Sequence, residues 1–189
     1  MLLTPTVDII DIRFHGRAGQ GVVTASRLLG EAAILNGKWV HAFPNFGPER
    51  MGAPVSAFTR ISEEKFTVKT QIENPDVIVI IDPSLVKEEK YYAGLKPGGK
   101  IIVNSSVVPE VLLKFTLEYE VWIVDGDKIS REYLGRTIAN TVMLGSLLKV
   151  TNLVEIDDLI SVLKDKFSGK IAEKNIKAIN AAYEEVKII

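Results

Sequence analysis

Short stretches in which apolar and polar residues alternate are separated along this chain by stretches with helical spacing. Residues 7–15 alternate and are rich in Ile and Val, which predicts a strand. Apolar residues then recur every three or four positions from about residue 20 to residue 36, which predicts a helix. Gly37 lies where a helix commonly ends, and residues 39–43 have the pattern of a short second strand.

The middle of the chain carries the patterns of further strands. Residues 55–61 alternate, and residues 65–69 are expected to pair with them. Three continuous apolar runs follow, at residues 76–81, 100–103 and 120–124. Such runs are typical of parallel strands that are covered on both faces.

Helical patterns dominate the end of the chain, from about residue 128. Residues 133–150 are apolar on most sides, which predicts one buried helix. An amphipathic helix is expected over residues 156–167, and a final helix after a break at Ser168 and Gly169.

Strands that alternate with helices predict an α/β fold. Right-handed crossovers arrange such elements in three layers, α/β/α, around a mostly parallel, twisted sheet. We expect the helical C-terminal end to pack on this sheet, because no linker-like stretch precedes it. The sequence therefore predicts a single domain over residues 1–189.

Composition and charge narrow the classes of function. The chain has 23 basic and 24 acidic residues, and it lacks the basic excess of nucleic-acid-binding domains. It has no cysteine, which excludes disulfides, a thiolate nucleophile and iron–sulfur ligation by thiolates of this chain. Its two histidines are too few for a metal site unless carboxylates join them. No apolar run is long enough to span a membrane and no secretory signal is visible, so we expect a cytoplasmic protein.

A glycine-rich segment connects the first predicted strand to the first predicted helix. Its sequence is Gly16-Arg17-Ala18-Gly19-Gln20-Gly21. Free backbone N–H groups and the helix dipole favour an anion at such a connection, glycine allows close approach, and Arg17 adds a bidentate cation. The spacing differs from the dinucleotide fingerprint G-x-G-x-x-G and lacks the Lys-Ser/Thr ending of a P-loop. The pattern is as compatible with a tight packing turn as with a phosphate or carboxylate contact.

A second loop follows the second predicted strand, at residues 44–54. In a parallel sheet it lies at the same carboxyl edge as the glycine-rich segment, so the two loops are expected to share one crevice. Arg50 is the candidate anion ligand of this loop. Apolar and arginine side chains together in a loop resemble interface anchors, so we also expect a partner contact. The candidate interface residues are Phe46, Gly47, Pro48, Glu49, Met51 and Gly52.

Three further polar residues have a structural and a functional interpretation. Asn140 lies in an apolar helical stretch and must find hydrogen-bond partners, either within the protein or in a ligand. His15 lies beside the glycine-rich segment without a visible acid partner or nucleophile, which favours a structural histidine. Asp82 follows an apolar strand and precedes a proline, and we expect it to cap the next turn. No residue stands out as catalytic.

Several of these segments together resemble a known family. Residues 14–25 (FHGRAGQGVVTA) are similar to the glycine loop of the gamma subunits of 2-oxoacid:ferredoxin oxidoreductases. Further similar segments are residues 46–55 (FGPERMGAPV), 140–145 (NTVMLG) and 170–175 (KIAEKN). The Gly-Pro-Glu-Arg version and the helical end look most like the pyruvate branch, the gamma subunit of pyruvate:ferredoxin oxidoreductase. The chain departs from the family pattern at Ala18 and Met51, where glycine and arginine are common.

This resemblance implies a subunit of pyruvate synthase, a complex that converts pyruvate, coenzyme A and oxidised ferredoxin to acetyl-CoA, carbon dioxide and reduced ferredoxin. It implies thiamine diphosphate and Mg²⁺ in the alpha and beta subunits, and 4Fe-4S clusters in beta and in a ferredoxin-like delta subunit. The gamma subunit is expected to pack on alpha and to help form the coenzyme A pocket. The residues expected to contact coenzyme A are Gly16, Arg17, Gly19, Gln20, Gly21, Arg50 and Asn140.

Three other interpretations remain open at this point. The complex could act on another 2-oxo acid, such as 2-oxoglutarate, a branched-chain oxo acid or indolepyruvate. The domain could be a free-standing nicotinamide-dependent dehydrogenase, although no acidic residue follows the second predicted strand to bind a ribose. It could also be an architectural subunit whose loops contact only protein.

Overall fold

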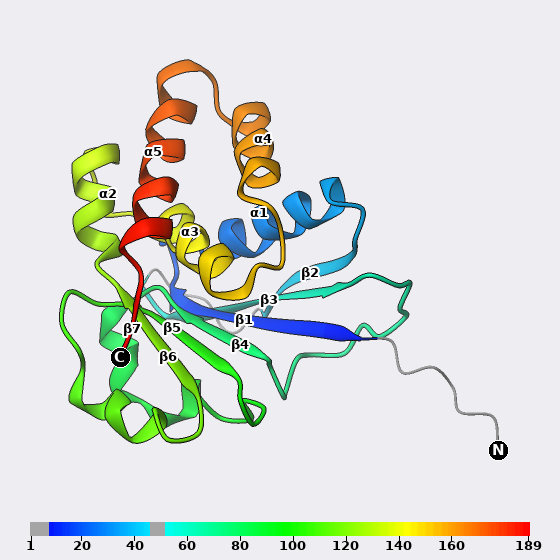
Figure 1. The fold of residues 1–189 in the computed structure, drawn as a ribbon, viewed down its shortest axis with the longest axis vertical. Helices are drawn as coiled ribbons and strands as arrows, with labels where there is room; N and C mark the ends of the chain where they lie inside the picture. Colours follow the sequence, from blue (N-terminus) through cyan, green and yellow to red (C-terminus); the bar gives the residue numbers. More distant parts are fainter. Residues whose placement is uncertain (1–7, 46–51) are drawn as a thin grey trace.

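A single sheet of seven strands organises the part of the chain that the computed structural model describes, residues 8–45 and 52–189. The order of the strands across the sheet is β2-β3-β1-β4-β5-β6-β7 (Figure 1). The strands are β1 (Ile9–Arg17), β2 (Trp39–Asn45), β3 (Pro54–Ser62), β4 (Val77–Ile80), β5 (Lys100–Asn104), β6 (Glu120–Val124) and β7 (Lys187–Ile188).

Five of these strands point in the same direction, which confirms the mostly parallel sheet. The neighbours β1, β4, β5 and β6 pair in parallel, whereas β3 is antiparallel to both β1 and β2, and β7 is antiparallel to β6. The connection from β2 to β3 is too short for a crossover, so β3 turns back along β2 and fills the space between β2 and β1.

The α-helices all cover one face of the sheet (Figure 1). They are α1 (Val22–Leu35), α2 (Gly126–Leu134), α3 (Asn140–Thr151), α4 (Ile156–Lys166) and α5 (Gly169–Glu185). The other face carries three 3-10 helices, η1 (Pro83–Lys87), η2 (Glu89–Tyr91) and η3 (Glu110–Phe115). The expected three-layer arrangement is therefore confirmed, with 3-10 turns in place of α-helices in one outer layer.

The continuous apolar runs of the central strands divide between two cores. In β4, Val77 and Val79 pack under the α-helices, and Ile78 and Ile80 pack under the 3-10 helices. All four side chains are buried, because successive residues of a strand point to opposite faces and both faces are covered.

The helical end differs from the expectation in one respect. The single helix predicted over residues 133–150 is wrong, because α2 ends at Leu134 and Gly135 adopts a φ of 71° before α3 begins at Asn140. Helix α2 begins at Gly126, and its N-cap is Asp125, whose carboxylate accepts a hydrogen bond from Lys128 N. The apolar pattern did not predict this start, because the first residues of the helix are polar. The helix predicted over residues 156–167 and the helix after it are confirmed as α4 and α5.

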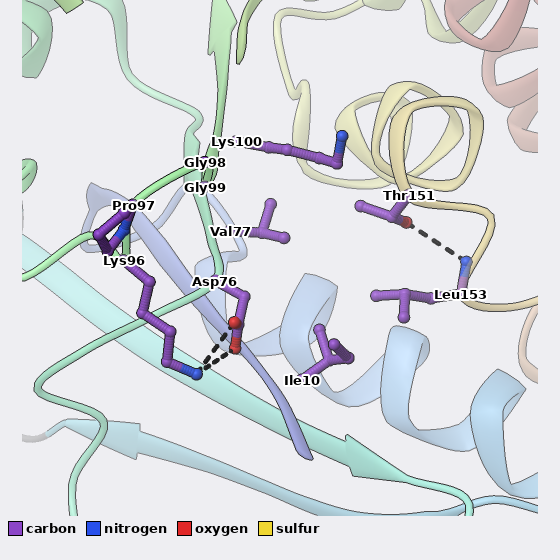
Figure 2. A pocket seen from close by; sticks show the side chains of 10 residues that line it. All are labelled: Ile10, Asp76, Val77, Lys96, Pro97, Gly98, Gly99, Lys100, Thr151 and Leu153. Atoms are coloured by element: carbon purple, nitrogen blue, oxygen red, sulfur yellow. Dashed lines mark hydrogen bonds and ion pairs between the residues drawn. The ribbon is translucent and has the colours of Figure 1, made fainter. Parts of the chain in front are cut away.

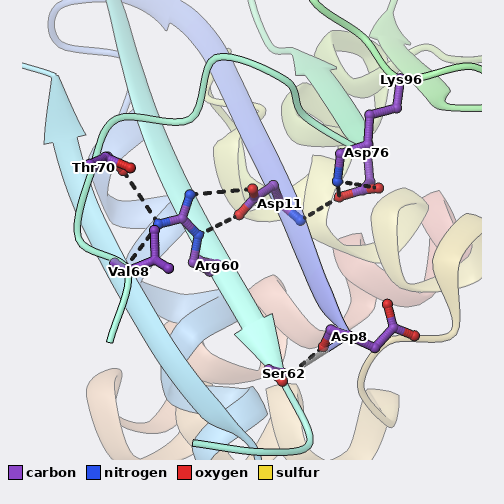
Figure 3. Close-up of polar contacts among 8 residues, drawn as sticks. All are labelled: Asp8, Asp11, Arg60, Ser62, Val68, Thr70, Asp76 and Lys96. Carbon is purple, nitrogen blue, oxygen red and sulfur yellow. Dashed lines mark hydrogen bonds and ion pairs between the residues drawn. The ribbon is translucent and has the colours of Figure 1, made fainter. Parts of the chain in front are cut away.

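The strand predicted over residues 65–69 is also wrong. This segment has no strand partner among the described residues, and Arg60 of β3 holds it instead (Figure 3). The Arg60 guanidinium donates from Nε to Asp11 Oδ1 at 2.7 Å and from Nη1 to the carbonyl oxygens of Val68 and Thr70 at 3.0 and 3.4 Å. A buried side chain therefore provides the contacts that a strand ladder was expected to make.

No helix within the described residues combines the length and the apolar character that crossing a bilayer requires.

Candidate functional site

The glycine loop, residues 16–21, joins the end of β1 to the start of α1 as the sequence predicted. Gln20 N donates to Arg17 O at 3.0 Å, which closes a tight turn. Gly21 forms the N-cap of α1 with a φ of 74°, a left-handed conformation that glycine adopts most easily. A Cβ on Gly21 would also lie 2.2 Å from Asn140 Nδ2, so the position requires glycine for space as well as for conformation.

The glycine loop lies directly beside the end of the second loop. Ala18 N donates to Ala53 O at 2.8 Å, and Gly52 N donates to Ala18 O at 3.4 Å. Strands β1 and β2 point the same way, so both loops lie at the carboxyl edge of the sheet. Of the second loop's candidates, Gly52 is thus adjacent to the glycine loop. The others lie outside the described residues: Phe46, Gly47, Pro48, Glu49, Arg50 and Met51.

The first turn of α1 presents backbone donors without a cap. No side chain caps the helix, its first turn has no acidic residue, and the first helical hydrogen bond is Ala25 N to Gly21 O. The N–H groups of the first three helical residues, from Val22 to Thr24, have no acceptor among the described residues. A depression of about 360 Å³ opens beside them, lined by Arg17, Ala18, Gly19, Gly21, Val22, Val23 and Val55. Uncapped N–H groups and the positive end of the helix dipole favour an anion there.

The Arg17 side chain borders this depression, and hydrogen bonds to Ser84 and Gly52 hold its guanidinium group in place. Its Nε and Nη2 donate to Ser84 Oγ at 3.1 and 2.8 Å, and its Nη1 donates to Gly52 O at 3.1 Å. Asp82 Oδ2 lies 3.5 Å from Arg17 Nε, and the arginine side chain remains 35% exposed. Arg17 is therefore accessible at the loop, while Asp82 offsets part of its charge.

Gln20 fills the inner side of the glycine loop. Its Oε1 accepts from Arg17 N at 2.7 Å, and its Nε2 donates to Asp82 Oδ2 at 2.5 Å. A Cβ on Gly16 would lie 2.6 Å from Val22 Cγ2 and 3.0 Å from Gln20 Oε1, so the glycine makes room for both side chains. The Gln20 side chain thus supports the turn from within the protein.

Asp82 is the buried centre of these contacts. Its Oδ1 accepts from Ser84 N and Ser84 Oγ at 2.8 and 2.5 Å, so it caps η1 as the sequence predicted. Burial alone would raise the pKa of Asp82, but hydrogen bonds from Ser84 and Gln20 and the charge of Arg17 together lower it. The carboxylate is therefore ionised at neutral pH and holds two segments at once. Its contact with the glycine loop could not be inferred from the strand pattern.

Asn140, at the start of α3, contacts the glycine loop from the helical layer. Its Nδ2 donates to Gly21 O at 3.2 Å, so this buried amide has the partner within the protein that its position demanded. Asn140 thereby links α3 to the turn that precedes α1.

His15 lies on the face of β1 opposite to the α-helices. Its Nε2 accepts from Arg13 Nε at 3.1 Å, which leaves Nδ1 to carry the proton and donate to Ser56 Oγ at 2.9 Å. Burial, and secondarily the charge of Arg13, lowers the pKa of His15 to about 3. The structural interpretation of His15 is confirmed, because both ring nitrogens are engaged within the protein.

A separate cavity of about 160 Å³ lies at the amino edge of the sheet, away from the glycine loop (Figure 2). Its charged groups are paired: Lys96 Nζ lies 2.8 Å from Asp76 Oδ2, and Lys100 Nζ lies 2.5 Å from Glu120 Oε2. Paired charges satisfy one another and leave little to attract a charged ligand. In the described ranges there is also no group of three or more His, Cys, Asp or Glu residues arranged to hold a metal ion.

Comparison with known proteins gives a consistent result. The family model described as pyruvate ferredoxin/flavodoxin oxidoreductase matches residues 11–185. A relative from Pyrococcus abyssi, the pyruvate/ketoisovalerate oxidoreductases common subunit gamma, is 48% identical over 182 residues, covering 95% of this chain and 98% of the relative. The pyruvate synthase subunit PorC of Methanothermobacter marburgensis is 47% identical over 180 residues, with coverage of 95% and 98%.

The solved structures agree with the sequence relatives. The crystal structure of the pyruvate oxidoreductase subunit PORC from Thermotoga maritima superposes with a TM-score of 0.86 and 38% identity, covering 95% of this chain and 98% of that one. With the family model matching almost the whole chain and relatives this similar, the chain belongs to the pyruvate ferredoxin/flavodoxin oxidoreductase family, among its gamma-type members.

Proposed function

We propose that this chain is the gamma subunit of a pyruvate:ferredoxin oxidoreductase, which converts pyruvate and coenzyme A to acetyl-CoA and carbon dioxide while reducing ferredoxin. The observation that carries this proposal is the end-to-end match to chains named as pyruvate synthase and pyruvate oxidoreductase subunits. A free-standing dehydrogenase is disfavoured, because the same match aligns the chain with subunits over almost their full length.

The chemistry at the oxo acid would belong to other chains of the complex. Alpha and beta subunits would hold thiamine diphosphate and Mg²⁺, and beta and delta subunits would hold the iron–sulfur clusters that pass electrons to ferredoxin. A chain without cysteine fits this division, because such clusters depend on several thiolate ligands. We place the assembled complex in the cytoplasm.

We further propose that the glycine loop contacts coenzyme A. Coenzyme A carries phosphate groups, and uncapped N–H donors at the start of α1 open into a depression that could receive one of them. Arg17 would add a charge at the rim, and Gly16, Gly19, Gln20, Gly21 and Asn140 would shape the loop. Arg50 would complete the crevice from the second loop. Phe46, Gly47, Pro48, Glu49, Met51 and Gly52 would contact a partner subunit.

A second substrate class has specific support. The relative from Pyrococcus abyssi is named as a subunit common to pyruvate and ketoisovalerate oxidoreductases. A chain that selects no oxo acid itself can serve two complexes, so we propose that this gamma subunit could also assemble with chains specific for a branched-chain 2-oxo acid.

Reconstitution tests the proposed function. Alpha, beta and delta subunits from the same organism are assembled with and without this chain, and ferredoxin reduction is measured with pyruvate, 2-oxoisovalerate or 2-oxoglutarate. We expect the chain to copurify with thiamine-binding and iron–sulfur subunits and to be required for full pyruvate-dependent, coenzyme A-dependent reduction. Full turnover without this chain would contradict the proposal.

The coenzyme A contact has its own test. In an assembled complex with Arg17→Ala, we expect the KM for coenzyme A to rise about tenfold and the KM for pyruvate to stay unchanged. Arg27→Ala removes an exposed arginine from α1 away from its first turn and serves as the matched control. An unchanged KM for coenzyme A in the Arg17 variant would remove the glycine loop's arginine from the site.

A further inference from the structure

The Asp82 network consists of Asp82, Ser84, Gln20 and Arg17, and it joins the end of β4 to the glycine loop. Asp82 is only 7% exposed and accepts three hydrogen bonds, from Ser84 N, Ser84 Oγ and Gln20 Nε2, at 2.8, 2.5 and 2.5 Å. Its Oδ2 also lies 3.5 Å from Arg17 Nε. One carboxylate thus contacts both residues that close the turn of the glycine loop.

The orientation of each group in the network is determined by its neighbours. Gln20 must direct its amide oxygen to Arg17 N and its amide nitrogen to Asp82, because an N–H donor needs an acceptor and a carboxylate accepts. The Ser84 hydroxyl gives its only proton to Asp82 and accepts from Arg17 Nε and Nη2. Each contact in this network pairs a donor with an acceptor, and exchanging the two ends of the Gln20 amide would break two of them, so the network favours one arrangement.

The glycine loop has little stiffness of its own. Gly19 and Gly21 have φ values of 95° and 74°, no proline lies in the loop, and no side chain caps the helix that follows. Glycine has more backbone freedom than other residues, so a turn of this composition must be held from outside. Within the turn, Gln20 N donates to Arg17 O at 3.0 Å and Arg17 N donates to Gln20 Oε1 at 2.7 Å. From outside, Ala53, Gly52 and Asn140 hold Ala18 and Gly21, and the Asp82 network holds Arg17 and Gln20.

We propose that Asp82 is a positioning residue, which holds the glycine loop so that the first N–H groups of α1 face the depression in the geometry that coenzyme A requires. This inference rests on the proposed coenzyme A contact. A ligand that meets a loop already in its bound shape does not lose affinity to ordering that loop. Asp82 therefore acts on the KM for coenzyme A through Gln20 and Arg17, without touching the ligand.

Asp76 provides a matched comparison at the other end of the same strand. Its carboxylate accepts from Asp11 N at 2.8 Å and pairs with Lys96 Nζ at 2.8 Å (Figure 3). Both aspartates therefore flank β4 and combine a backbone contact with an ion pair, but Asp76 lies at the amino edge of the sheet. An effect of general stability would appear in variants of both residues.

The experiment uses the assembled complex with wild-type chain, Asp82→Asn, Ser84→Ala or Asp76→Asn, and measures kcat, the KM values for coenzyme A and pyruvate, and Tm. We expect Asp82→Asn to raise the KM for coenzyme A about tenfold, with the KM for pyruvate and kcat within about twofold of wild type. Ser84→Ala should raise the same KM by a smaller factor. Asp76→Asn should lower Tm and leave the KM for coenzyme A unchanged.

The Arg17→Ala complex separates the two proposals. If Arg17→Ala raises the KM for coenzyme A and Asp82→Asn does not, the positioning role is overturned while the contact survives. If neither variant changes this KM in an assembled complex, both proposals fail. An equal rise in Asp76→Asn and Asp82→Asn would also overturn the positioning role. Should Asp82→Asn fail to assemble, Ser84→Ala decides, because it removes the hydrogen bonds from Arg17 to the Ser84 hydroxyl and keeps the buried carboxylate.

Discussion

Gly21 shows how one residue couples two helices that are far apart in the sequence. Its carbonyl accepts from Asn140 Nδ2 at 3.2 Å, and its missing side chain leaves the space that this amide occupies. A glycine in a predicted turn indicates a permitted backbone conformation, but the steric demand of Asn140 comes from a residue far along the chain. The sequence therefore predicted the conformational requirement and not the contact.

Gly37 separates these two requirements experimentally. It has a φ of 77°, close to that of Gly21, but a Cβ there would meet nothing within 4 Å. We expect Gly37→Ala to cost about 1 kcal/mol of unfolding free energy and Gly21→Ala about 2 to 4 kcal/mol, since only the second adds a clash to the left-handed strain. Urea unfolding of the full chain measures both.

The double variant Gly21→Ala with Asn140→Ala completes this test. It leaves the Cβ of residue 140 as the nearest atom of that side chain, at 3.4 Å, so we expect it to be less destabilised than the sum of the single variants. Additive effects would show that the clash with Asn140 is not the source of the cost.

His15 gives a second test at the scale of one residue. Its pKa is about 3 in the folded chain against an ordinary value of 6.5, because burial and the Arg13 charge disfavour the imidazolium. Below pH 6.5 the unfolded chain therefore binds a proton that the folded chain does not bind. The resulting stability is present above pH 6.5 and is lost as the pH falls from there toward 3.

We expect wild type to lose about 1.4 kcal/mol more unfolding free energy than His15→Gln when the pH is lowered from about 7.5 to 5.5. Glutamine offers a donor and an acceptor but does not titrate in this range. His41 stays in both proteins, so its own lowered pKa cancels in the difference. Parallel pH profiles for the two proteins would show that His15 titrates normally in the folded chain.

At the scale of elements, most strands and helices were predictable from the apolar runs and from the glycines that end helices, because these patterns are local in the sequence. The five-residue strand β6 and the helix α4 follow directly from such signals. The gap between α2 and α3 escaped prediction, because the residues before and after it are apolar enough to continue one helix and Gly135 alone marks the break. The two-residue β7 is too short to leave a pattern, and it forms because β6 offers it an edge.

The connection between β3 and β4 depends on a buried side chain instead of a backbone pattern. The side chains of Arg60 and Asp11 are 5% and 14% exposed. Removing the arginine therefore leaves a nearly buried carboxylate without its ion-pair partner, and it leaves the carbonyl oxygens of the segment around Val68 without their donor. We expect Arg60→Ala to cost about 3 to 5 kcal/mol of unfolding free energy. Trypsin should also cleave faster at Lys65 and Lys69 than in wild type.

The exposed pair of Glu31 and Lys166 is the control for Arg60. Their side chains are 43% and 42% exposed, so Glu31→Gln should change the unfolding free energy by less than about 0.5 kcal/mol. Equal costs for Glu31→Gln and Arg60→Ala, or unchanged cleavage at the two lysines, would contradict this role of Arg60.

For the whole molecule, the order of the strands in the sheet determines which residues meet at the candidate site. The ends of β1, β2 and β4 and the starts of β3 and α3 meet at one edge, which brings together the glycine loop, Gly52, Asp82 and Asn140. Parallel strand direction predicted that the two loops share this edge. The neighbour relation of β1 and β4 was not predictable, because three other elements separate these strands along the chain and no local pattern records which strands pair.

The family resemblance supplied what local patterns could not. Glycine spacing alone left a ligand contact and a packing turn equally open, whereas the combined segments identified the family that the comparisons then confirmed. The structure adds that the inner side of the glycine loop is filled by Gln20, and that the side facing Val55 is open. An open outer side is what a ligand or a partner chain would need.

Hydrogen exchange in the assembled complex tests the central claim most directly, that the backbone donors at the start of α1 bind coenzyme A. Exchange of peptides covering residues 17–25 is compared with and without saturating coenzyme A, using residues 65–71 as an internal reference. We predict that coenzyme A slows exchange in residues 17–25 and leaves the reference unchanged. Unchanged exchange in residues 17–25, in a complex that turns over with coenzyme A, would contradict the account.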